Sequence, residues 1–483
     1  MSVWKNIALA LALVTAAPVS AVAEETGAGD EEPSLPAGLD DDEPGLPAGL
    51  GDEEPALPGG LEGDGTQEVE AAAASTEDTS FPLSLSGFFS LSGGARVQED
   101  PDQKRSPLGE ARLQMRVEGS WLPMSLKTAV AADFIFDAIV DEYEPNLETG
   151  MGAVDLREAS IAASPTEWAD LKVGRQVLTW GTGDLLFIND LFPKDWNAFL
   201  IGHDMEYLKA PSDAVKLALF SDVANLDIVY TPRFDADRFP DRRRLSSWDP
   251  MTQDVVGRDV LVEVDQPDRW FRDDEIAARL YRRIGRTEVA AYGYRGYWKS
   301  PAGFDPMTGE ATFPELSVYG ASARRPLLGG IANVEGGFYD SRSDRLGTDP
   351  MVRNSEGRVL VGYERELVPE LTLGLQYYAE LMRHYGNHVR SQPEGVALAD
   401  ERRQLVSMRL TWLAMSQSLR ASFFGYYSPT DQDAAFFPSV SYAIDDHWKS
   451  VVGANLFVGD KRYTFFGQLE DNSSVFTSLR YAW

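Results

Sequence analysis

The stretch from Gly109 to Trp121, GEARLQMRVEGSW, alternates strictly between polar or charged side chains and apolar or small ones. Successive side chains of a β-strand point to opposite faces, whereas a helix would scatter these charges around its circumference. The same alternation runs from Leu371 to Leu381 and from Val406 to Trp412. Such strands exceed the usual globular strand of about 5 to 6 residues and match the roughly 9 to 11 tilted residues that cross a bilayer. The pattern therefore predicts an all-β, membrane-spanning barrel.

The connections between the predicted strands alternate between tight turns and longer polar loops. Eight turns and nine loops indicate a transmembrane antiparallel β-barrel of about 18 strands, with 16 as the alternative, and place both barrel ends on the short-turn side. An even number of strands with both ends on the short-turn side is typical of single-chain outer-membrane barrels, whose short turns are periplasmic. The expected strands cover residues 85–98, 109–121, 126–139, 153–163, 169–180, 214–221, 225–232, 275–284, 287–298, 315–324, 330–340, 356–366, 370–382, 402–413, 417–427, 436–444, 448–457 and 474–483.

Residues 1–23 are typical of a secretory signal peptide. Lys5 precedes an apolar run from Ile7 to Val19, and Ala21-Val22-Ala23 forms a small-x-small cleavage site. The run is too short for a membrane helix of about 20 residues, and no later uncharged stretch reaches that length. A helix retained at the N-terminus is the alternative. The chain has no cysteine, which excludes disulfides, a lipidated cysteine and cysteine chemistry.

Residues 24–80 form an acidic segment that contrasts with the rest of the chain. They hold 18 Asp and Glu, no Lys or Arg and no aromatic residue. Uniform charge with frequent proline predicts a disordered segment on the periplasmic side, ahead of a barrel over residues 81–483. Within residues 31–64 the pattern EPxLPxGL occurs three times, which favours either a spacer copied by slippage or a motif that docks in a partner's groove. The candidate docking residues are Leu35, Leu39, Leu46, Leu50, Leu57 and Leu61.

The last predicted strand, 474–483, ends on an aromatic residue. Its alternation places Leu479, Tyr481 and Trp483 on one face, which resembles the terminal signal read by the bacterial barrel assembly machinery. This strand must close on the first one, because an open edge in lipid leaves backbone groups unsatisfied. We therefore expect a location in the bacterial outer membrane, in contact with its lipid. A soluble β-sandwich or a secreted β-rich enzyme is the alternative.

One block of the chain carries a family resemblance. LKVGRQVLTWGTGDLLFINDLFPKDW, Leu171 to Trp196, preceded by LREASIA at Leu156 to Ala162, resembles a large, mostly uncharacterised proteobacterial outer-membrane family with a GRQ...WG strand motif. The closing strands are similar to those of other porin-like families, more distantly the alginate-export type. Phe192 stands where the first family has Asn in an N-P-x-D turn. The resemblance implies a channel or transport barrel, sometimes associated with inner-membrane transporters of the resistance-nodulation-division type, and names no substrate.

If the apolar faces of the strands meet lipid, their charged faces point into the barrel. An 18-stranded barrel is wide enough for an aqueous channel unless loops fill it, and charges that line it would set its selectivity. For each charge, pairing with a neighbour merely to stabilise the wall is the alternative. The candidate lumen-lining residues are Arg112, Arg116, Asp133, Asp137, Lys216, Asp227, Arg279, Glu364, Glu380, Arg409 and Arg420.

Two connections, 181–213 and 232–274, are unusually long, and long ordered loops are often functional. The first is rich in aromatic residues that would not stay in water. We expect it to fold into the mouth or lumen as a constriction, with packing against the outer rim as the alternative. Its candidate residues are Trp180, Asp184, Asp190, Lys194, Asp195 and Trp196. The second mixes arginines with aspartates, which leaves open an extracellular salt-bridged lid or a contact with anionic lipid headgroups.

Composition and motifs argue against several classes of function. The net charge of −32 disfavours nucleic acid, whose phosphates are bound by Lys and Arg. The chain has four histidines, none near a GxSxG motif, and no catalytic constellation, so we expect no enzyme activity, metal or cofactor. The sequence predicts an outer-membrane channel for passage or export of a solute, whose tail docks a periplasmic or inner-membrane transporter partner. A plugged barrel that acts as an assembly or scaffold protein is one alternative, and a tail that blocks the lumen is another.

Overall fold

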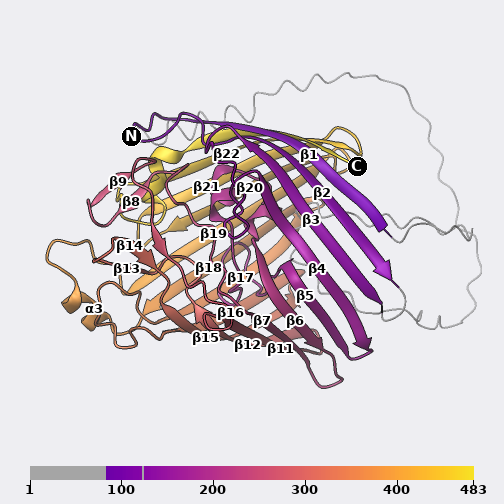
Figure 1. Cartoon of the computed structure of the whole chain (residues 1–483), viewed down its shortest axis with the longest axis horizontal. Helices are drawn as coiled ribbons and strands as arrows, with labels where there is room; N and C mark the ends of the chain where they lie inside the picture. The colour runs from indigo at the N-terminus through magenta and orange to yellow at the C-terminus, as the bar shows by residue number, and fades with distance from the viewer. Residues whose placement is uncertain (1–82, 122–124) are drawn as a thin grey trace, which may run out of the picture. The chain divides into compact units, whose positions relative to one another are not determined.

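The computed structural model describes residues 83–121 and 125–483 of the chain. Within them, 18 strands form one sheet in which neighbouring strands are antiparallel. β1 (Leu83–Arg96) pairs with both β2 (Gly109–Trp121) and β23 (Ser474–Ala482), so the sheet closes on itself (Figure 1). Closure leaves no open strand edge, as a barrel in lipid requires. The predicted 18-stranded barrel is confirmed, whereas the predicted signal peptide and the acidic repeats lie outside the described residues.

The remaining barrel strands follow their expected ranges to within a few residues. They are β3 (Leu126–Asp137), β4 (Val154–Thr166), β5 (Ala169–Val177), β6 (Pro211–Leu219), β7 (Asn225–Thr231), β11 (Glu275–Ile284), β12 (Thr287–Tyr297), β15 (Glu315–Leu327), β16 (Gly330–Ser341), β17 (Glu356–Val368), β18 (Leu371–Met382), β19 (Arg402–Ala414), β20 (Leu419–Ser428), β21 (Asp433–Ala443) and β22 (Trp448–Gly459). One connection is shorter than expected: residues 429–432 make a tight turn between β20 and β21. The Ser428 hydroxyl accepts a hydrogen bond from the Asp431 amide there at 3.1 Å, which closes the turn.

The other long connections leave the barrel at one end, which we call the long-loop end (Figure 1). The connection between β5 and β6 lies inside the barrel and carries α2 (Trp196–Ile201) and η1 (Met205–Leu208). The other long connections carry the short elements β8 (Ser247–Asp249), β9 (Asp254–Val256), β10 (Val264–Asp265), β13 (Gly303–Asp305), β14 (Glu310–Thr312), α3 (Tyr385–Ser391) and η2 (Gly467–Asn472). The opposite, tight-turn end has connections as short as residues 285–286 and 328–329. Across the described ranges, no helix has the length and apolar character needed to span a membrane.

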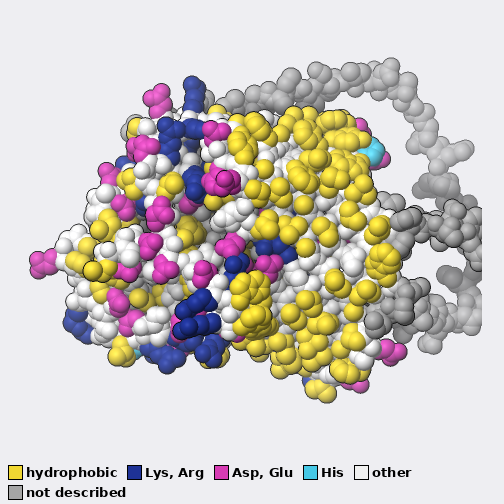
Figure 2. Space-filling view, in the orientation of Figure 1, with side chains coloured by type: hydrophobic (Ala, Val, Ile, Leu, Met, Phe, Trp, Pro, Cys, Tyr) yellow, Lys and Arg dark blue, Asp and Glu magenta, His cyan; other side chains and the backbone are white. Residues whose placement is uncertain are grey.

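The outward faces of the strands form an apolar belt. Val117, Leu280, Val361 and Trp412, each from a different strand, are between 38% and 51% exposed. Figure 2 shows apolar side chains covering the strand region of one face, with charged side chains concentrated over the long connections. So large an exposed apolar surface is unfavourable in water and favourable in lipid. The chain is therefore a transmembrane β-barrel.

The seam of the barrel joins the first strand to the last. Phe89 lies opposite Tyr481, and the backbone of Trp483 exchanges hydrogen bonds of 3.3 and 3.1 Å with that of Gly87. Gly87 is required here, because an added Cβ would lie 2.3 Å from the Gln114 carbonyl oxygen and 2.8 Å from the Trp483 ring. The aromatic end of the chain thus packs on the outer face of the seam, where Trp483 is 44% exposed.

Candidate channel and the connection inside the barrel

Residues 178–210 join β5 to β6 and fold into the barrel rather than over its rim. The GRQ motif holds the start of this connection at the wall. Arg175 donates to the Leu156 carbonyl oxygen at 2.7 Å, and Gln176 donates to the Ala214 carbonyl oxygen at 3.1 Å. Both side chains are buried, so the motif fixes the direction in which the chain leaves β5. We call residues 178–210 the inner connection.

The inner connection is anchored to the wall formed by β16, β18 and β19. The buried Glu335 carboxylate of β16 accepts four hydrogen bonds, from the amides of Thr182 and Asn189 at 2.8 Å each and from their side chains at 3.0 Å each. Arg409 of β19 holds the Asp184 carboxylate with two contacts of 2.5 and 2.8 Å. Charge-assisted and bidentate hydrogen bonds are the strong ones. These contacts fix the first half of the inner connection to one side of the barrel.

The second half of the inner connection reaches the opposite side. The Tyr207 hydroxyl donates to the buried Asp133 carboxylate of β3 at 2.7 Å, and Arg112 of β2 lies 4.3 Å from the centre of the Tyr207 ring. Arg480 of β23 contacts the Glu206 carboxylate at 3.1 Å. The inner connection therefore spans the lumen from β16 and β19 to β2, β3 and β23.

A short helix, α2, shapes the middle of the inner connection. The Asp195 side chain caps its N-terminus by accepting from the Ala198 amide at 2.8 Å. Gly202 ends it with φ of 90°, in the left-handed region that favours glycine. An added Cβ at Gly202 would lie 2.4 Å from the Phe476 ring, so the turn fits closely against β23.

The second long connection, 232–274, packs on the first. Arg238 binds the Asp155 carboxylate of β4 with two contacts of 2.8 Å and reaches Asp195 at 3.4 Å. Asp237 accepts from the Lys194 amide at 2.7 Å and from the Trp196 indole at 3.1 Å, and burial raises the pKa of its carboxyl. Its ion pairs therefore join this connection to the strands and to the inner connection.

Some of the predicted constriction residues contact one another inside the inner connection, and others lie at or near a cavity. Asp190 and Lys194 form a buried ion pair of 2.9 Å, and Trp180 packs edge to face on Phe192 with ring centres 4.9 Å apart. Together with Trp196 these residues lie within the inner connection, and they line neither of two cavities that lie along β2. Asp195 lines one of these cavities, and Asp184 binds Arg409, which lines the other.

Two cavities in the described part of the lumen lie one beyond the other along the barrel axis. The tight-turn cavity, about 200 Å³, is lined by β1, by β19 to β23 and by the second half of the inner connection. The long-loop cavity, about 90 Å³, is lined by the first residues of β2, the last of β3 and the connections above them. Four lining residues belong to both cavities: Glu110, Arg112, His203 and Tyr207. We call these four residues the partition.

The partition is a compact group of polar side chains. Glu110 and Arg112 form an ion pair of 2.7 Å, and Arg112 also contacts Asp133 at 2.6 Å. His203 lies 3.6 Å from Glu110, and its buried Nε2 has no hydrogen-bond partner within the described part of the chain. Burial lowers the pKa of His203, so its ring is neutral at physiological pH. A solute that passes between the cavities along β2 must displace these side chains.

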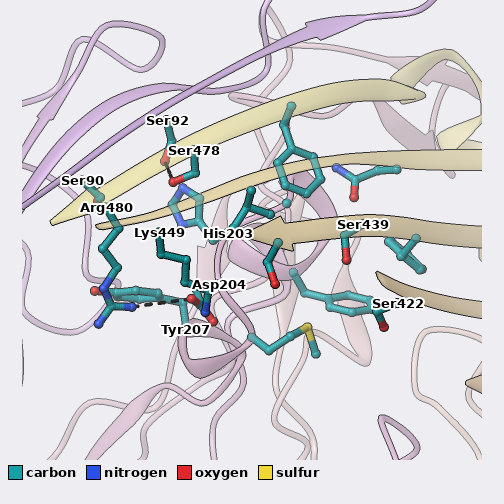
Figure 3. A pocket seen from close by; sticks show the side chains of 18 of the residues that line it. Ser90, Ser92, His203, Asp204, Tyr207, Ser422, Ser439, Lys449, Ser478 and Arg480 are labelled. Atoms are coloured by element: carbon teal, nitrogen blue, oxygen red, sulfur yellow. Dashed lines mark hydrogen bonds and ion pairs between the residues drawn. The ribbon is translucent and has the colours of Figure 1, made fainter. Parts of the chain in front are cut away.

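The tight-turn cavity places cations and hydroxyl groups around its wall (Figure 3). Arg480 extends from β23 toward Asp204, 3.5 Å away, and Lys449 projects from the neighbouring strand β22. The Ser92 hydroxyl donates to that of Ser478 across the seam at 3.0 Å. The arrangement offers hydrogen-bond donors from several strands to one space.

All eleven candidate lumen residues lie on the inward faces of their strands, opposite the exposed apolar side chains. Several pair with one another or with neighbours: Arg116 with Glu118 and Glu158, Arg279 with Glu288, Asp137 with Arg244, and Glu380 with Arg353 and Arg403. Arg420 lines the tight-turn cavity. Asp227 is buried on β7, Lys216 lies opposite Lys172 in the β5–β6 ladder, and Glu364 lies opposite Gly374.

Sequence reasoning missed four residues that the structure makes central. Glu335 occupies an inward position of the expected strand 330–340, so the same alternation that selected Glu364 could have found it. Glu110 likewise shares a face with Arg112 in the alternating stretch. His203 and Tyr207 lie in the inner connection, where no periodicity marks which side chains face a cavity.

No family model and no curated protein matches this chain. Solved structures do. OccD3 (OpdP) of Pseudomonas aeruginosa matches with 8% identity and a TM-score of 0.49 over 83% of this chain and 91% of that one. The outer membrane protein OpdK of the same organism matches with 10% identity and a TM-score of 0.49, over 83% and 98% of the two chains. OmpF of Salmonella typhi, solved with daunomycin, matches with 9% identity and a TM-score of 0.42, over 83% and 97%.

The residues of this chain define its class. It is a closed, membrane-spanning barrel whose lumen holds a long connection with cavities beside it, the architecture of a porin-like protein.

Proposed function

We propose that this chain is a porin-like channel of a bacterial outer membrane, through which a solute passes or is exported. The observation that carries the proposal is the partition: the two cavities lie on the same side of the lumen and share four lining residues. The inner connection spans the lumen, and these two cavities are spaces that it leaves, so a route between them runs along β2. The partition closes this route with side chains, and side chains move faster and at less cost than a folded segment.

The orientation of the barrel supports a periplasmic location for the N-terminal segment. β1 begins, and β23 ends, at the tight-turn end, which faces the periplasm in outer-membrane barrels. The acidic repeats in residues 31–64 would then be available to a periplasmic or inner-membrane transporter partner, with their leucines as docking residues. During biogenesis the outward aromatic end of β23 is the surface offered to the barrel assembly machinery, and the apolar belt is the surface offered to outer-membrane lipid.

Conductance in planar bilayers tests the channel. The full chain without residues 1–23 is purified and compared with Tyr207→Ala, which removes the largest side chain of the partition. We expect the variant to conduct several-fold more than the parent, because the ring blocks the route between the cavities. Tyr319→Ala is the matched control: Tyr319 is 62% exposed on the outer face, so the same truncation leaves the lumen unchanged.

A plugged barrel that acts as a scaffold is the second candidate function. It is favoured by the apolar cluster that the inner connection forms with the wall, which includes Ile188, Leu200 and Leu360. This candidate predicts that the parent and the Tyr207→Ala variant both insert without conducting. That result would overturn the channel proposal.

Deletion of residues 24–80 tests the role of the acidic segment. If the segment docks a partner, conductance of the purified protein stays normal while transport in cells is lost. If it blocks the lumen, conductance rises in the deletion variant. If it is a spacer, neither changes, and the docking proposal is wrong.

A further inference from the structure

One side of the tight-turn cavity carries cations and hydroxyl groups. Arg420, Lys449 and Arg480 come from β20, β22 and β23. The residues that line the cavity from β20 to β23 and from β1 include no carboxylate. They include six serines: Ser90, Ser92, Ser422, Ser439, Ser441 and Ser478. Guanidinium, ammonium and hydroxyl groups all donate hydrogen bonds, so this wall, which we call the donor wall, is suited to the oxygen atoms of an anion.

The register of the strands concentrates positive charge on the donor wall. Lys449 and Arg480 are directly opposite each other across the β22–β23 ladder. Like charges in such positions repel, and an anion between or beside them relieves the repulsion. The inner connection already supplies carboxylates here: Arg480 contacts Glu206 at 3.1 Å and Asp204 at 3.5 Å. The site therefore binds carboxylate oxygens in the structure itself.

The same strands also carry apolar side chains into the cavity, farther from the tight-turn end than the cations. Phe199 of α2 lies on Phe437 with ring centres 4.7 Å apart, and Phe424 and Phe476 also line the space. The volume of about 200 Å³ suits a molecule with one ring, since an apolar cavity of about 150 Å³ holds benzene. A bound molecule would thus meet donors toward the tight-turn end and phenyl rings deeper in the barrel.

We propose that the tight-turn cavity is a binding site for a small organic anion with an apolar body, such as an aromatic carboxylate. The proposal names the solute class of the channel proposed above and rests on it. The anionic group lies against Lys449, Arg420 and Arg480, where it replaces a carboxylate of the inner connection, and the apolar body lies among the phenylalanines. Exchange of one carboxylate for another keeps the charge balance of the site.

Three probes separate the requirement for an anionic group from the requirement for an apolar ring. Benzoate has both the charge and the ring, benzamide has the ring without the charge, and acetate has the charge without the ring. Binding to the purified chain lacking residues 1–23 is measured by titration calorimetry in detergent, and inhibition of KCl current in planar bilayers. We expect benzoate to bind about tenfold or more tightly than either other probe, because only benzoate uses both the donors and the phenyl rings of the cavity.

Variants locate the site. Lys449→Gln and Arg420→Gln should each weaken benzoate binding by about tenfold and leave benzamide unchanged. Arg282→Gln is the matched control, because Arg282 is an exposed cation on the outward face of β11. Ser478→Asp provides a second test with a small change in volume: the added carboxylate on the donor wall should abolish benzoate binding.

The outcomes distinguish this proposal from the channel itself. Equal binding of benzoate and benzamide, or benzoate binding that survives in Ser478→Asp, would overturn the anion site while leaving any measured conductance as evidence for a channel. Benzoate binding in a protein that never conducts would support the site and overturn the channel. If Lys449→Gln does not fold, the Ser478→Asp variant and the three probes on the parent still decide.

Discussion

Two sides of the lumen differ in how they use buried charge. On the side of β16 and β19, Glu335 and Arg409 are fully engaged with Thr182, Asn189 and Asp184 of the inner connection. On the side of β20 to β23 and β1, the cations and serines of the donor wall face a cavity. The first side holds a segment in place, and the second leaves room for a solute. The inner connection also reaches the second side, through Tyr207 and Glu206, so it narrows the passage there without filling it.

The largest effect is expected from the anchoring side. Glu335→Ala would remove four hydrogen bonds of the inner connection, at about 1 to 3 kcal/mol for each donor that stays buried without another acceptor. We expect a lower temperature for the heat-induced shift in gel mobility, and a higher conductance as the inner connection detaches. Glu118→Ala is the control, because Glu118 points inward on β2 but its side chain is 50% exposed. Equal shifts in both variants would show that Glu335 does not anchor the connection.

A smaller effect is expected from Asp184→Asn. The change removes the charge that Arg409 holds at 2.5 and 2.8 Å, and hydrogen bonds to charged groups contribute about 1.5 to 3 kcal/mol. The lumen gains a positive charge relative to the parent, so the reversal potential in a KCl gradient should shift toward anion selectivity. Arg409→Gln should shift it the other way. In the double variant the two shifts should cancel if they are additive, and a departure from their sum would measure the coupling of the pair.

The pH dependence of selectivity reports on the loop carboxylates beside the donor wall. Burial and the nearby Asp204 charge raise the pKa of Glu206, so this carboxyl takes up its proton at a milder acidity than an ordinary Glu. Between pH 7 and that pKa the lumen loses a negative charge as pH falls, while His203 stays neutral because its pKa is lowered. Anion selectivity should therefore rise on acidification. Glu206→Gln should show the acid selectivity already at pH 7, and a parent that becomes more cation-selective in acid would contradict the assignment.

The smallest effect is expected at the seam. Ser92→Ala removes one hydrogen bond of 3.0 Å to Ser478, which contributes about 0.5 to 1.5 kcal/mol at most. The melting temperature should fall slightly and the conductance should not change, because β1 and β23 remain paired through their backbones. A large rise in conductance would mean that the seam side chains, rather than the anchoring side, determine the width of the passage.

The sequence predicts the strands well because lipid imposes one rule on all of them. Gly109–Trp121 matches its expected range, since an outward apolar residue is needed at every second position of a lipid-facing strand. The connection at 429–432 was predicted longer than it is. Its pairing extends to Asp433 and Ala434, whose side chains give no alternating signal.

The contacts of inward side chains are less predictable, because they depend on the particular segment that fills the lumen. Alternation places Arg409 and Arg420 on inward faces, and both line the tight-turn cavity, but Arg409 also binds Asp184 of the inner connection. Nothing in their local sequence distinguishes them, since the partner of Arg409 is 225 residues away. The inner connection itself was predicted from its aromatic content. Its polar residues Asp190 and Lys194 pair with each other in the interior, which spacing alone does not show.

The donor wall is built from both ends of the barrel chain. Ser92 and Ser478, which meet across the seam, are separated by 386 positions. Contacts of such separation form late, because the whole intervening chain must first be brought together. A barrel that stalls during insertion with its first and last strands apart would have neither a sealed edge nor a complete cavity. Binding of an organic anion would therefore detect only fully closed barrels. Such binding would measure assembly as well as transport.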